Sequence, residues 1–337
     1  MSRAPTEIAA GDFTQERFVR EIAPECRPVV LRGLVDDWPA VRAARESPRA
    51  LISYLARFDT GAQIEVFFGE PAIAGKYYYG EGLKGFNFER RMMGFADAMQ
   101  AIVAALETAD GKSVYAGSAP CKECLPGFAP GNPMPLLTPE TPPRIWLGTA
   151  ANVSSHYDTF DNLACVIAGQ RRFTLYAPEL ISRLYVGPID HTMAGPPVSL
   201  AASSPQDDER FPLFREVRDQ AWVCELGPGD ALYLPKLWWH QVESMAPFNG
   251  LVNYWWDAFA AGPDSPYTSL LLALITIAER PPAERQAWKA FFDHYVFRTN
   301  GHPLAHLPAE QRGLLGPLKP DNYANIRARV MQLLRGR

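Results

Sequence analysis

The chain has 337 residues, of which 47% are hydrophobic and 21% charged, so it is long enough to bury a large core. Its net charge of -4 shows no basic excess, which argues against nucleic acid as the default partner. It shows neither a signal peptide nor an apolar run long enough to cross a bilayer, so we expect a cytoplasmic protein without a membrane anchor.

The first third of the chain mixes short strands with helices. Apolar residues predict a strand at 28–34, and polar-apolar alternation predicts a half-buried strand at 63–68. Residues 76–79 are a further strand candidate. Apolar residues at helical spacing predict helices near 40–57 and over 95–106.

A change of pattern follows the segment 119–143, which is rich in proline and predicts a long loop over the surface or across the mouth of a site. Beyond it, short apolar runs alternate with turn signals such as Pro228-Gly229-Asp230. Strands of this number and spacing are typical of an antiparallel sandwich or jelly roll. The predicted strands are 144–148, 162–167, 172–176, 221–225, 231–234 and 250–256.

The C-terminal part predicts helices. Ser265 and the following proline supply an N-cap and a first-turn residue, a second helix is predicted at 282–297, and Asp321 is placed to cap a third. We therefore divide the chain into a β-rich domain at 1–260 and a helical extension at 261–337. The third helix carries an apolar stripe that either packs on its own domain or forms a homodimer face: Tyr323, Ile326, Val330, Leu333 and Leu334.

Two polar clusters far apart in the sequence contain residues that bind metals. His156 and Asp158 are two residues apart, so in a strand both side chains point to one face. His240 closes an apolar run that passes through a proline and two tryptophans. Each motif alone is commonly a surface pair or a core histidine. Together, two imidazoles and a carboxylate match the facial triad of non-haem Fe(II) oxygenases.

An oxygenase of this type needs a cation for the distal carboxylate of its cosubstrate, preferably one that makes two parallel hydrogen bonds. Arg171 and Arg172 are both candidates. Alternation places Arg171 on the more apolar face, so it is the favoured inward cation; the alternative is a solvated arginine beside a turn. Asn162 and Asn253 lie in apolar runs, where they indicate either a buried polar network or pairing with backbone at bulges.

These segments resemble the cupin-like jumonji-C family over roughly residues 20–260, and within it the branch of the hypoxia-inducible-factor asparaginyl hydroxylase and its bacterial relatives. The resemblance is carried by 152–162, 169–178 and 227–244. It implies a mainly β fold with α elements: a double-stranded β-helix (cupin or jelly roll) as the catalytic domain, flanking N-terminal helices and a C-terminal helical extension.

The resemblance also implies roles for individual residues. His156, Asp158 and His240 match the Fe(II) ligands, and Arg171 stands where the asparaginyl hydroxylase has a lysine. Ser154 stands for a threonine, with the chain one residue shorter there. The positions implied for binding 2-oxoglutarate are Tyr115, Ser154, Asn162, Arg171 and Asn253, and those implied for the substrate pocket are Trp239 and Trp255.

The implied activity is Fe(II)- and 2-oxoglutarate-dependent hydroxylation of a C–H bond in a peptide, protein or small molecule. A non-redox metal-dependent cupin, such as an isomerase or lyase, would use the same triad without needing Arg171. A catalytically silent binding module is a third alternative, which the complete triad disfavours. Substrate choice commonly resides in loops such as 119–143, which has no counterpart that aligns with the family.

Cys121 and Cys124 form an isolated Cys-x-x-Cys, a weak zinc signature without a second pair. They are either two loop cysteines, part of a zinc site completed by a remote residue or another chain, or a redox pair. Five cysteines without framework spacing fit a reducing compartment. His191 lies in a loop-like stretch and is expected at the surface or the pocket rim rather than at a metal.

Overall fold

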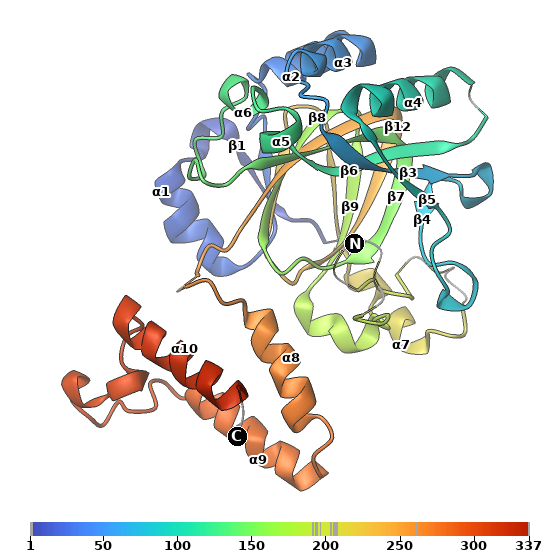
Figure 1. The fold of residues 1–337 in the computed structure, drawn as a ribbon. Coiled ribbons are helices and arrows are strands. Elements are labelled where there is room, and N and C mark those ends of the chain that lie inside the picture. Colours follow the sequence, from blue (N-terminus) through green and yellow to red (C-terminus); the bar gives the residue numbers. More distant parts are fainter. Residues whose placement is uncertain are drawn as a thin grey trace. The chain divides into compact units, whose positions relative to one another are not determined.

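The computed structural model describes residues 3–335 apart from 109, 191, 193, 194, 196, 203, 205–207 and 261. The chain forms two compact units, Met1–Asp257 and Ala258–Arg337. The first is built on β-strands with helices packed against them, and the second is helical (Figure 1). No helix among the described residues is both long enough and apolar enough to span a membrane.

Two long strands organise the first unit, β7 (Pro143–His156) and β12 (Trp239–Trp256), which pair antiparallel. The first half of β12 also pairs with β9 (Arg171–Tyr176), whereas its second half pairs with β8 (Asp161–Ala168). A register irregularity between Ser244 and Phe248 separates the two halves. Because β12 contributes to two sheets, the fold is the double-stranded β-helix expected from the sequence, and that prediction is confirmed.

The remaining strands extend the two sheets on either side of β7 and β12. All twelve strands are hydrogen-bonded into one continuous network, whose main path, here called the larger sheet, has the order β1-β2-β11-β8-β12-β7-β6-β3-β5. Off this path, β9 pairs with β12 and β10, which form the smaller sheet, and β4 pairs with β7. Their bounds are β1 (Thr6–Ala9), β2 (Val29–Arg32), β3 (Gln63–Gly69), β4 (Lys76–Tyr77), β5 (Glu89–Gly94), β6 (Ser113–Pro120), β10 (Trp222–Leu226) and β11 (Ala231–Leu234).

Helices cover the outer face of the larger sheet (Figure 1). They are α2 (Pro39–Glu46), α3 (Pro48–Ala56) and α4 (Phe95–Thr108). The sequence predicted one helical stretch near 40–57, but Ser47 is extended and its hydroxyl accepts from the N–H of Ala50. Proline at 48 disfavours helical geometry in the residue before it, so the stretch becomes two helices.

β8 is buried along its whole length, which explains why most of its residues are apolar without alternation. Along β8, Leu163, Cys165 and Ile167 pack with the helices, whereas Ala164 and Val166 face the space between the sheets. A strand enclosed on both faces has no solvent side to carry polar residues. The polar residues that do occur there therefore need a specific partner or a specific role.

The segment 119–143 is not the surface loop that its prolines predicted. It contains α5 (Cys121–Cys124) and α6 (Phe128–Gly131), and Leu125 and both cysteines lie in the core under the larger sheet. Buried Asn132 ties this segment to the helices, because its side-chain Oδ1 accepts from the N–H of Ala40. The prediction failed because the buried residues are spaced irregularly and so carry no periodic signal.

The remaining elements are short, or belong to the second unit. They are α1 (Gln15–Arg17), a π turn (Phe18–Ile22), α7 (Pro212–Arg215), α8 (Pro266–Ile277), α9 (Pro282–Tyr295) and α10 (Pro320–Leu334). Turns of 3-10 helix lie at Ala10–Asp12, Ala23–Glu25, Pro71–Ile73, Glu81–Leu83, Pro178–Arg183, Arg218–Gln220, Ala309–Gln311 and Gly313–Leu315.

Two predicted helix starts in the second unit had different outcomes. The hydroxyl of Ser265 accepts from the N–H of Tyr267 at 3.2 Å, so the predicted cap of α8 is confirmed. The predicted cap at Asp321 was wrong, since Lys319 occupies the N-cap position of α10. The cause is Pro320, whose fixed φ suits the first helical position and starts the helix two residues earlier.

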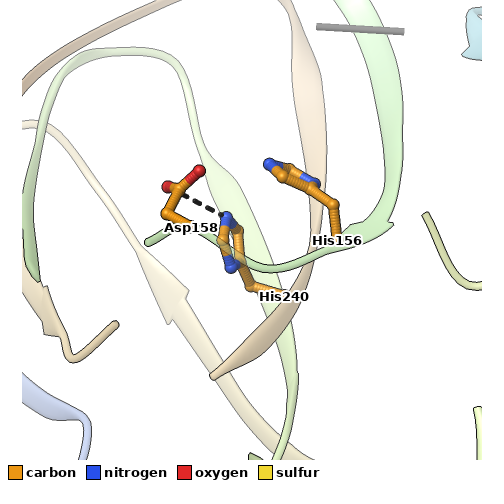
Figure 2. A group of neighbouring side chains, drawn as sticks. All are labelled: His156, Asp158 and His240. Carbon is orange, nitrogen blue, oxygen red and sulfur yellow. Dashed lines mark ion pairs between the residues drawn. The ribbon is translucent and has the colours of Figure 1, made fainter. Parts of the chain in front are cut away.

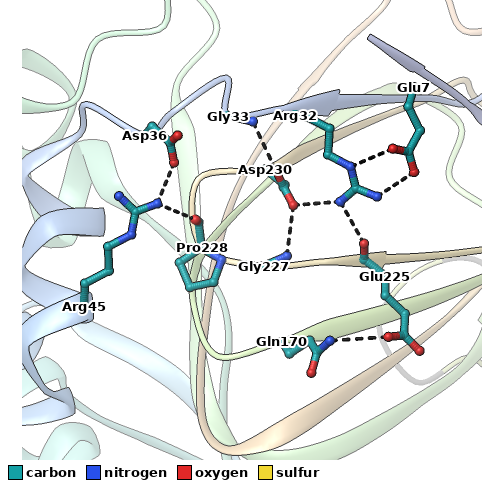
Figure 3. A network of polar contacts seen from close by, with 10 residues as sticks. All are labelled: Glu7, Arg32, Gly33, Asp36, Arg45, Gln170, Glu225, Gly227, Pro228 and Asp230. Atoms are coloured by element: carbon teal, nitrogen blue, oxygen red, sulfur yellow. Dashed lines mark hydrogen bonds and ion pairs between the residues drawn. The ribbon is translucent and has the colours of Figure 1, made fainter. Parts of the chain in front are cut away.

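A polar network fixes the turn that leads into β11 (Figure 3). The guanidinium of Arg32 in β2 donates to the carboxylate of Glu7 at 2.6 and 3.0 Å and to Asp230 at 2.7 Å. The Asp230 carboxylate also accepts from the backbone N–H groups of Gly33 and Gly227, each at 3.1 Å. One aspartate therefore joins β2 to the turn before β11, and β11 leads to His240.

We expect Asp230→Ala to lower the free energy of unfolding by about 3 kcal/mol, since a charge-assisted bond and two backbone partners are lost together. Urea denaturation followed by circular dichroism measures this loss. Asp36→Ala is the matched control, because its pair with Arg45 is about half exposed and contributes less than about 1 kcal/mol. Equal losses in the two variants would contradict a structural role for the network.

Candidate functional site

The three predicted ligands converge at one end of the space between the sheets. His156 and Asp158 lie at and just beyond the end of β7, and register sets His240 near the start of β12 opposite His156. One potential ligand atom from each lies within 4.8 Å of the others (Figure 2). Among the described residues, this is the one cluster of histidine, cysteine, aspartate or glutamate with such spacing.

Both imidazoles are oriented by backbone carbonyls. Nδ1 of His156 lies 2.9 Å from the carbonyl of Ser154, and Nδ1 of His240 lies 3.0 Å from that of Trp238. A carbonyl only accepts, so Nδ1 carries the proton and Nε2 keeps its lone pair for a metal. Burial, the His156 ring beside it and, in opposition, Asp158 set the pKa of His240 at about 4, so this imidazole is neutral at pH 7.

The triad opens into a cavity that offers about 120 Å³ to water-sized molecules. Eight of the ten residues singled out from the sequence line it: His156, Asp158, His240, Tyr115, Asn162, Arg171, Asn253 and Trp255. The rest of the wall is apolar or aromatic: Phe67, Tyr77, Phe88, Trp146, Val153, Ala164, Phe173, Val198, Val242 and Leu251. The cavity thus combines the candidate metal triad and one buried cation with a mainly apolar wall.

Arg171 is the buried cation, with 1% of its surface exposed. As alternation predicted, it points inward, whereas Arg172 is exposed and pairs with Glu225 at 2.8 Å. Nε and Nη2 of Arg171 have no hydrogen-bond partner among the described residues. The hydroxyl of Tyr115 lies beside the guanidinium; burial raises the pKa of this tyrosine, and Arg171 opposes the shift. Two donors therefore remain for an anionic ligand.

The two asparagines belong to a hydrogen-bonded chain across the sheet. The Trp146 indole N–H donates to the side-chain Oδ1 of Asn253 at 2.7 Å, and the side-chain NH₂ of Asn253 donates to Oδ1 of Asn162 at 3.2 Å. This sequence of bonds orients both amides and leaves the NH₂ of Asn162 available to the cavity. Sequence reasoning missed Trp146, because a tryptophan in a predicted strand normally indicates core packing.

Trp255 has a direct contact with the triad. Its indole N–H donates to Oδ2 of Asp158 at 3.1 Å, while the Nε2 atom of His240 lies 3.8 Å from the same oxygen. Trp255 thus orients the carboxylate as well as lining the cavity. Trp255 also packs edge-on against Trp146, with ring centroids 6.0 Å apart.

Two of the proposed residues lie outside the described cavity wall. Ser154 is buried and its hydroxyl donates to the carbonyl of Tyr77 at 3.0 Å, so its polar group is already used. Trp239 points away from His240, because neighbours in a strand face opposite sides, and packs on Tyr157 at 4.9 Å. His191 lies outside the described residues.

A buried ion pair, which sequence reasoning also missed, joins the two ligand-bearing segments. Asp161, 1% exposed, accepts from the hydroxyl of Tyr233 at 3.2 Å and lies 3.3 Å from Nζ of Lys236. Lys236 also pairs with Asp257, and the next residue, Leu237, donates its N–H to the carbonyl of Asp158 at 2.8 Å. The connection before His240 is thereby held against the connection after His156.

The charge on Lys236 is retained in this setting. Burial alone would lower its pKa, but the hydrogen bond to Asp257 and the charge of Asp161 outweigh burial and raise it. Two features of the sequence could have pointed to this ion pair. Asp161 precedes Asn162 at the start of β8, and Lys236 lies three residues before Trp239. Neither position has a periodicity that marks it as buried.

The two cysteines of the Cys-x-x-Cys are buried in the core, each 1% exposed. The thiol of Cys124 donates to the carbonyl of Pro120 at 3.0 Å, and burial raises its pKa to about 11. Burial likewise raises the pKa of Cys121. No third ligand lies near them among the described residues, and a high thiol pKa disfavours both metal binding and redox exchange.

We expect Asp161→Ala to weaken metal binding roughly ten-fold, the usual scale for groups that orient ligands. Lys236 keeps Asp257, so no charge is left unpaired. Titration of the metal-free protein with Co²⁺, followed by its visible absorption, measures the change at a temperature where both proteins are folded. Glu225→Gln, which breaks an exposed pair, is the control. Unchanged metal affinity would show that Asp161 stabilises the fold without orienting the metal ligands.

We expect one thiol in five to react rapidly with Ellman's reagent in the folded protein at pH 8, since Cys26 is exposed and the other cysteines are buried. All five should react after unfolding in guanidinium. Cys26→Ser should abolish the rapid phase. Rapid reaction of three thiols, or zinc that copurifies and disappears in Cys121→Ser, would restore a chemical role for the Cys-x-x-Cys.

Comparison with known proteins agrees with this architecture. A family model described as a cupin-like domain matches residues 15–262. The chain is 38% identical to Jumonji C domain-containing protein 5 of Drosophila melanogaster over 34% of this chain and 27% of that protein. It is 31% identical to HSPB1-associated protein 1 of Homo sapiens, over 43% and 30% of the two chains.

A third relative is the lysine-specific demethylase JMJ31 of Arabidopsis thaliana, 32% identical over 34% of this chain and 21% of the relative. The matched regions therefore span less than a third of each of these three relatives. The family model, in contrast, covers well over half of this chain. The chain belongs to the cupin-like domain family and, as its motifs implied, is related to jumonji-C proteins.

Proposed function

We propose that the protein is an Fe(II)- and 2-oxoglutarate-dependent oxygenase that hydroxylates a C–H bond of a peptide, protein or small-molecule substrate. The observation that carries the proposal is Arg171, a buried guanidinium in the same cavity as a His-Asp-His triad, with two donor atoms that no described residue pairs. A buried charge without a partner costs several kcal/mol. A ligand with a carboxylate would supply that partner.

The donor set fits Fe(II) and a keto acid. Two imidazoles and one carboxylate are the ligands of the non-haem iron triad, which leaves positions open for a bidentate cosubstrate. Bound Fe(II) and 2-oxoglutarate together would supply the oxidising power for C–H hydroxylation. The register of β9 and β12 supports separate positions for metal binding and carboxylate binding. Arg171 lies opposite Ser244, and Ser244 is four residues along β12 from His240, roughly 13 Å at strand spacing.

The chain's own residues would position the reactants. His156, Asp158 and His240 would hold the metal, with the tautomers and the carboxylate fixed by the contacts described above. Arg171 and Tyr115 would hold the distal carboxylate, the guanidinium by two parallel hydrogen bonds. The NH₂ of Asn162, oriented by the Trp146 chain, would donate to an oxygen nearer the metal.

The aromatic wall would exclude water and receive the substrate. Phe67, Tyr77 and Phe88 pack together at one side of the cavity, with ring centroids 4.9 to 6.0 Å apart. A dry cavity strengthens every electrostatic contact inside it and protects a strong oxidant from side reactions. Relatives carry names such as lysine-specific demethylase, so N-methyl carbons belong among the C–H bonds to be tested.

A non-redox cupin is the second candidate, since the same triad would also hold zinc or manganese. It gives no reason for a buried Arg171 whose Nε and Nη2 have no partner among the described residues. A silent binding module gives no reason for either the triad or the arginine. Metal analysis of the purified protein, together with 2-oxoglutarate binding, separates the three functions.

We expect Arg171→Leu to weaken 2-oxoglutarate binding on the order of 100-fold, as is usual when one partner of a buried charge pair is removed. Binding to the Mn²⁺-loaded protein is measured by calorimetry, so the readout does not depend on turnover. Without cosubstrate the variant should be no less stable than the wild type, because an unpaired buried charge has been replaced by an apolar side chain. Metal affinity should be unchanged.

Arg172→Leu is the matched control, since Arg172 is exposed and lies on the other face of β9. Succinate formation from 2-oxoglutarate by the iron-loaded wild type, with pools of peptides and metabolites as substrates, then tests the reaction itself. A wild-type protein that binds no 2-oxoglutarate, or an Arg171→Leu variant that binds it normally, would refute the proposal and favour the non-redox cupin.

A further inference from the structure

Arg144 in β7 lies beside the cavity that contains the triad. Trp146, two residues further along the strand, lines this cavity, and residues two apart point to the same face of a strand. Register places Arg144 opposite Asn253 of β12, which also lines the cavity. The guanidinium lies 5.8 Å from the ring centroid of Trp255, another residue of the wall. Because Arg144 is only partly buried, its side chain lies at the rim of the cavity.

An irregularity in the neighbouring strand β6 fixes the guanidinium in place. Nε of Arg144 donates to Oγ of Ser118 at 2.5 Å, and Nη2 donates to the carbonyl of the same residue at 2.6 Å. Ser118 lies where the register of β6 shifts between Ala116 and Ala119, and its φ of 52° is uncommon for a residue other than glycine. A side chain that is held in this way loses little further freedom when it binds a ligand.

The protein partners of Arg144 in the described part of the chain are all uncharged. It forms no ion pair with a described residue, whereas Arg32 and Arg183, two other partly buried arginines, each pair with a carboxylate. Burial raises the pKa of the nearby Cys121 and Cys124 thiols, so they carry no compensating charge at pH 7. The two bonds to the serine use two of the five N–H groups of a guanidinium, and the other three have no partner among the described residues.

The charges of the cavity wall favour a second anion at this position. Asp158 is the one acidic residue among those that line the cavity, and in the proposed function its charge is directed to the metal. Arg171 would be occupied by the distal carboxylate of 2-oxoglutarate. Arg144 is then a second cation at the same cavity, and no part of the proposed chemistry so far uses it. Complementary charge of this kind is how a site selects its ligand.

Trp255 connects the rim to the candidate metal site. Its indole N–H donates to Oδ2 of Asp158 at 3.1 Å, while the guanidinium of Arg144 lies near its ring. One aromatic side chain therefore reaches from a candidate metal ligand to the cation at the rim. A ligand group bound at Arg144 and a carbon at the metal would thus be separated by about the length of one side chain.

We infer that Arg144 determines the specificity of the site by binding a carboxylate of the substrate through the N–H groups that Ser118 leaves unused. The substrate class is therefore acidic, either a peptide with aspartate or glutamate near the oxidised residue or a small carboxylic acid. This role in a reaction rests on the proposed function, whereas the binding of a carboxylate at Arg144 can be measured without any turnover. An arginine that only stabilised the irregularity in β6 would show no preference for acids.

Binding of acidic and neutral probes to the full chain, loaded with Mn²⁺ and saturated with 2-oxoglutarate, tests the inference. The probes are a peptide array that compares aspartate and glutamate with asparagine and glutamine, and aliphatic and aromatic carboxylic acids compared with their amides. We expect the best acids to bind at least about ten-fold more tightly than the matched amides, the scale of a hydrogen bond to a charged group. The two sets of probes separate peptides from small acids.

Arg144→Gln should abolish the preference for acids, and Arg144→Lys should keep part of it, because lysine retains the charge but not the planar fork. The lysine variant keeps the test decisive if the glutamine variant is poorly folded. Arg57→Gln is the matched control and should bind acids as the wild type does. Arg57 also lies over an aromatic ring, that of Tyr54 at 4.6 Å, and donates to a backbone carbonyl, but it is exposed and does not line the cavity.

The outcomes separate this inference from the proposed function. Acid binding that depends on Arg144, in a protein that forms no succinate when loaded with iron, contradicts the proposed function alone. With turnover present, Arg144→Lys should raise KM for the best acidic probe more than it lowers kcat. A wild type that binds acids no better than amides overturns the inference, and so does a preference for acids that survives Arg144→Gln.

Discussion

The register between β7 and β12 is the constraint on which the site depends. It sets His240 opposite His156, and so brings together ligands that are far apart in the sequence. A shift of one residue would turn every side chain of the strand to the opposite face. The apolar residues of β12 that face the space between the sheets oppose such a shift, because each would lose its buried apolar neighbours. The core packing therefore specifies the position of the candidate metal site as well as the fold.

Buried charge is used in two different ways around this centre. Asp161 and Lys236 neutralise each other and join the two connections that carry the ligands, so their charges serve geometry. Arg171 lacks such a partner among the described residues and faces the cavity. An unpaired guanidinium lowers stability, and the proposed function gives this one a carboxylate ligand. The contrast distinguishes a charge pair that joins two segments from a charge whose donors remain without a protein partner in the part of the chain that the structure describes.

Much of this architecture could be predicted from the residues alone, for identifiable reasons. Strand alternation placed Arg171 inward, and the spacing of His156 and Asp158 placed both on one face. The motifs around His240 led to the correct family. Features without a local pattern escaped prediction: the packing of 119–143 depends on irregularly spaced apolar residues, and the roles of Trp146 and Lys236 depend on partners about twenty to more than one hundred residues away.

Trp239 shows that a residue next to a candidate ligand in the sequence need not lie in the site. It is adjacent to a ligand in sequence, yet the pleat of the strand turns it to the opposite side, where it packs on Tyr157. Asn162 and Asn253, by contrast, were correctly suspected from a local conflict, a polar amide in an apolar strand. Departures from a local rule located the cavity better than proximity to a known motif did.

The late place of β12 in the chain has a consequence for how the protein is made. This strand completes the pairing of β7, β8 and β9, so on the ribosome those strands wait for residues 239–256 to emerge before their hydrogen-bonding edges are covered. Until then, long apolar edges are open to pairing with other chains, which is the situation that favours aggregation during slow, non-local folding. The nascent chain should therefore depend on chaperones most strongly just before its last strand is synthesised.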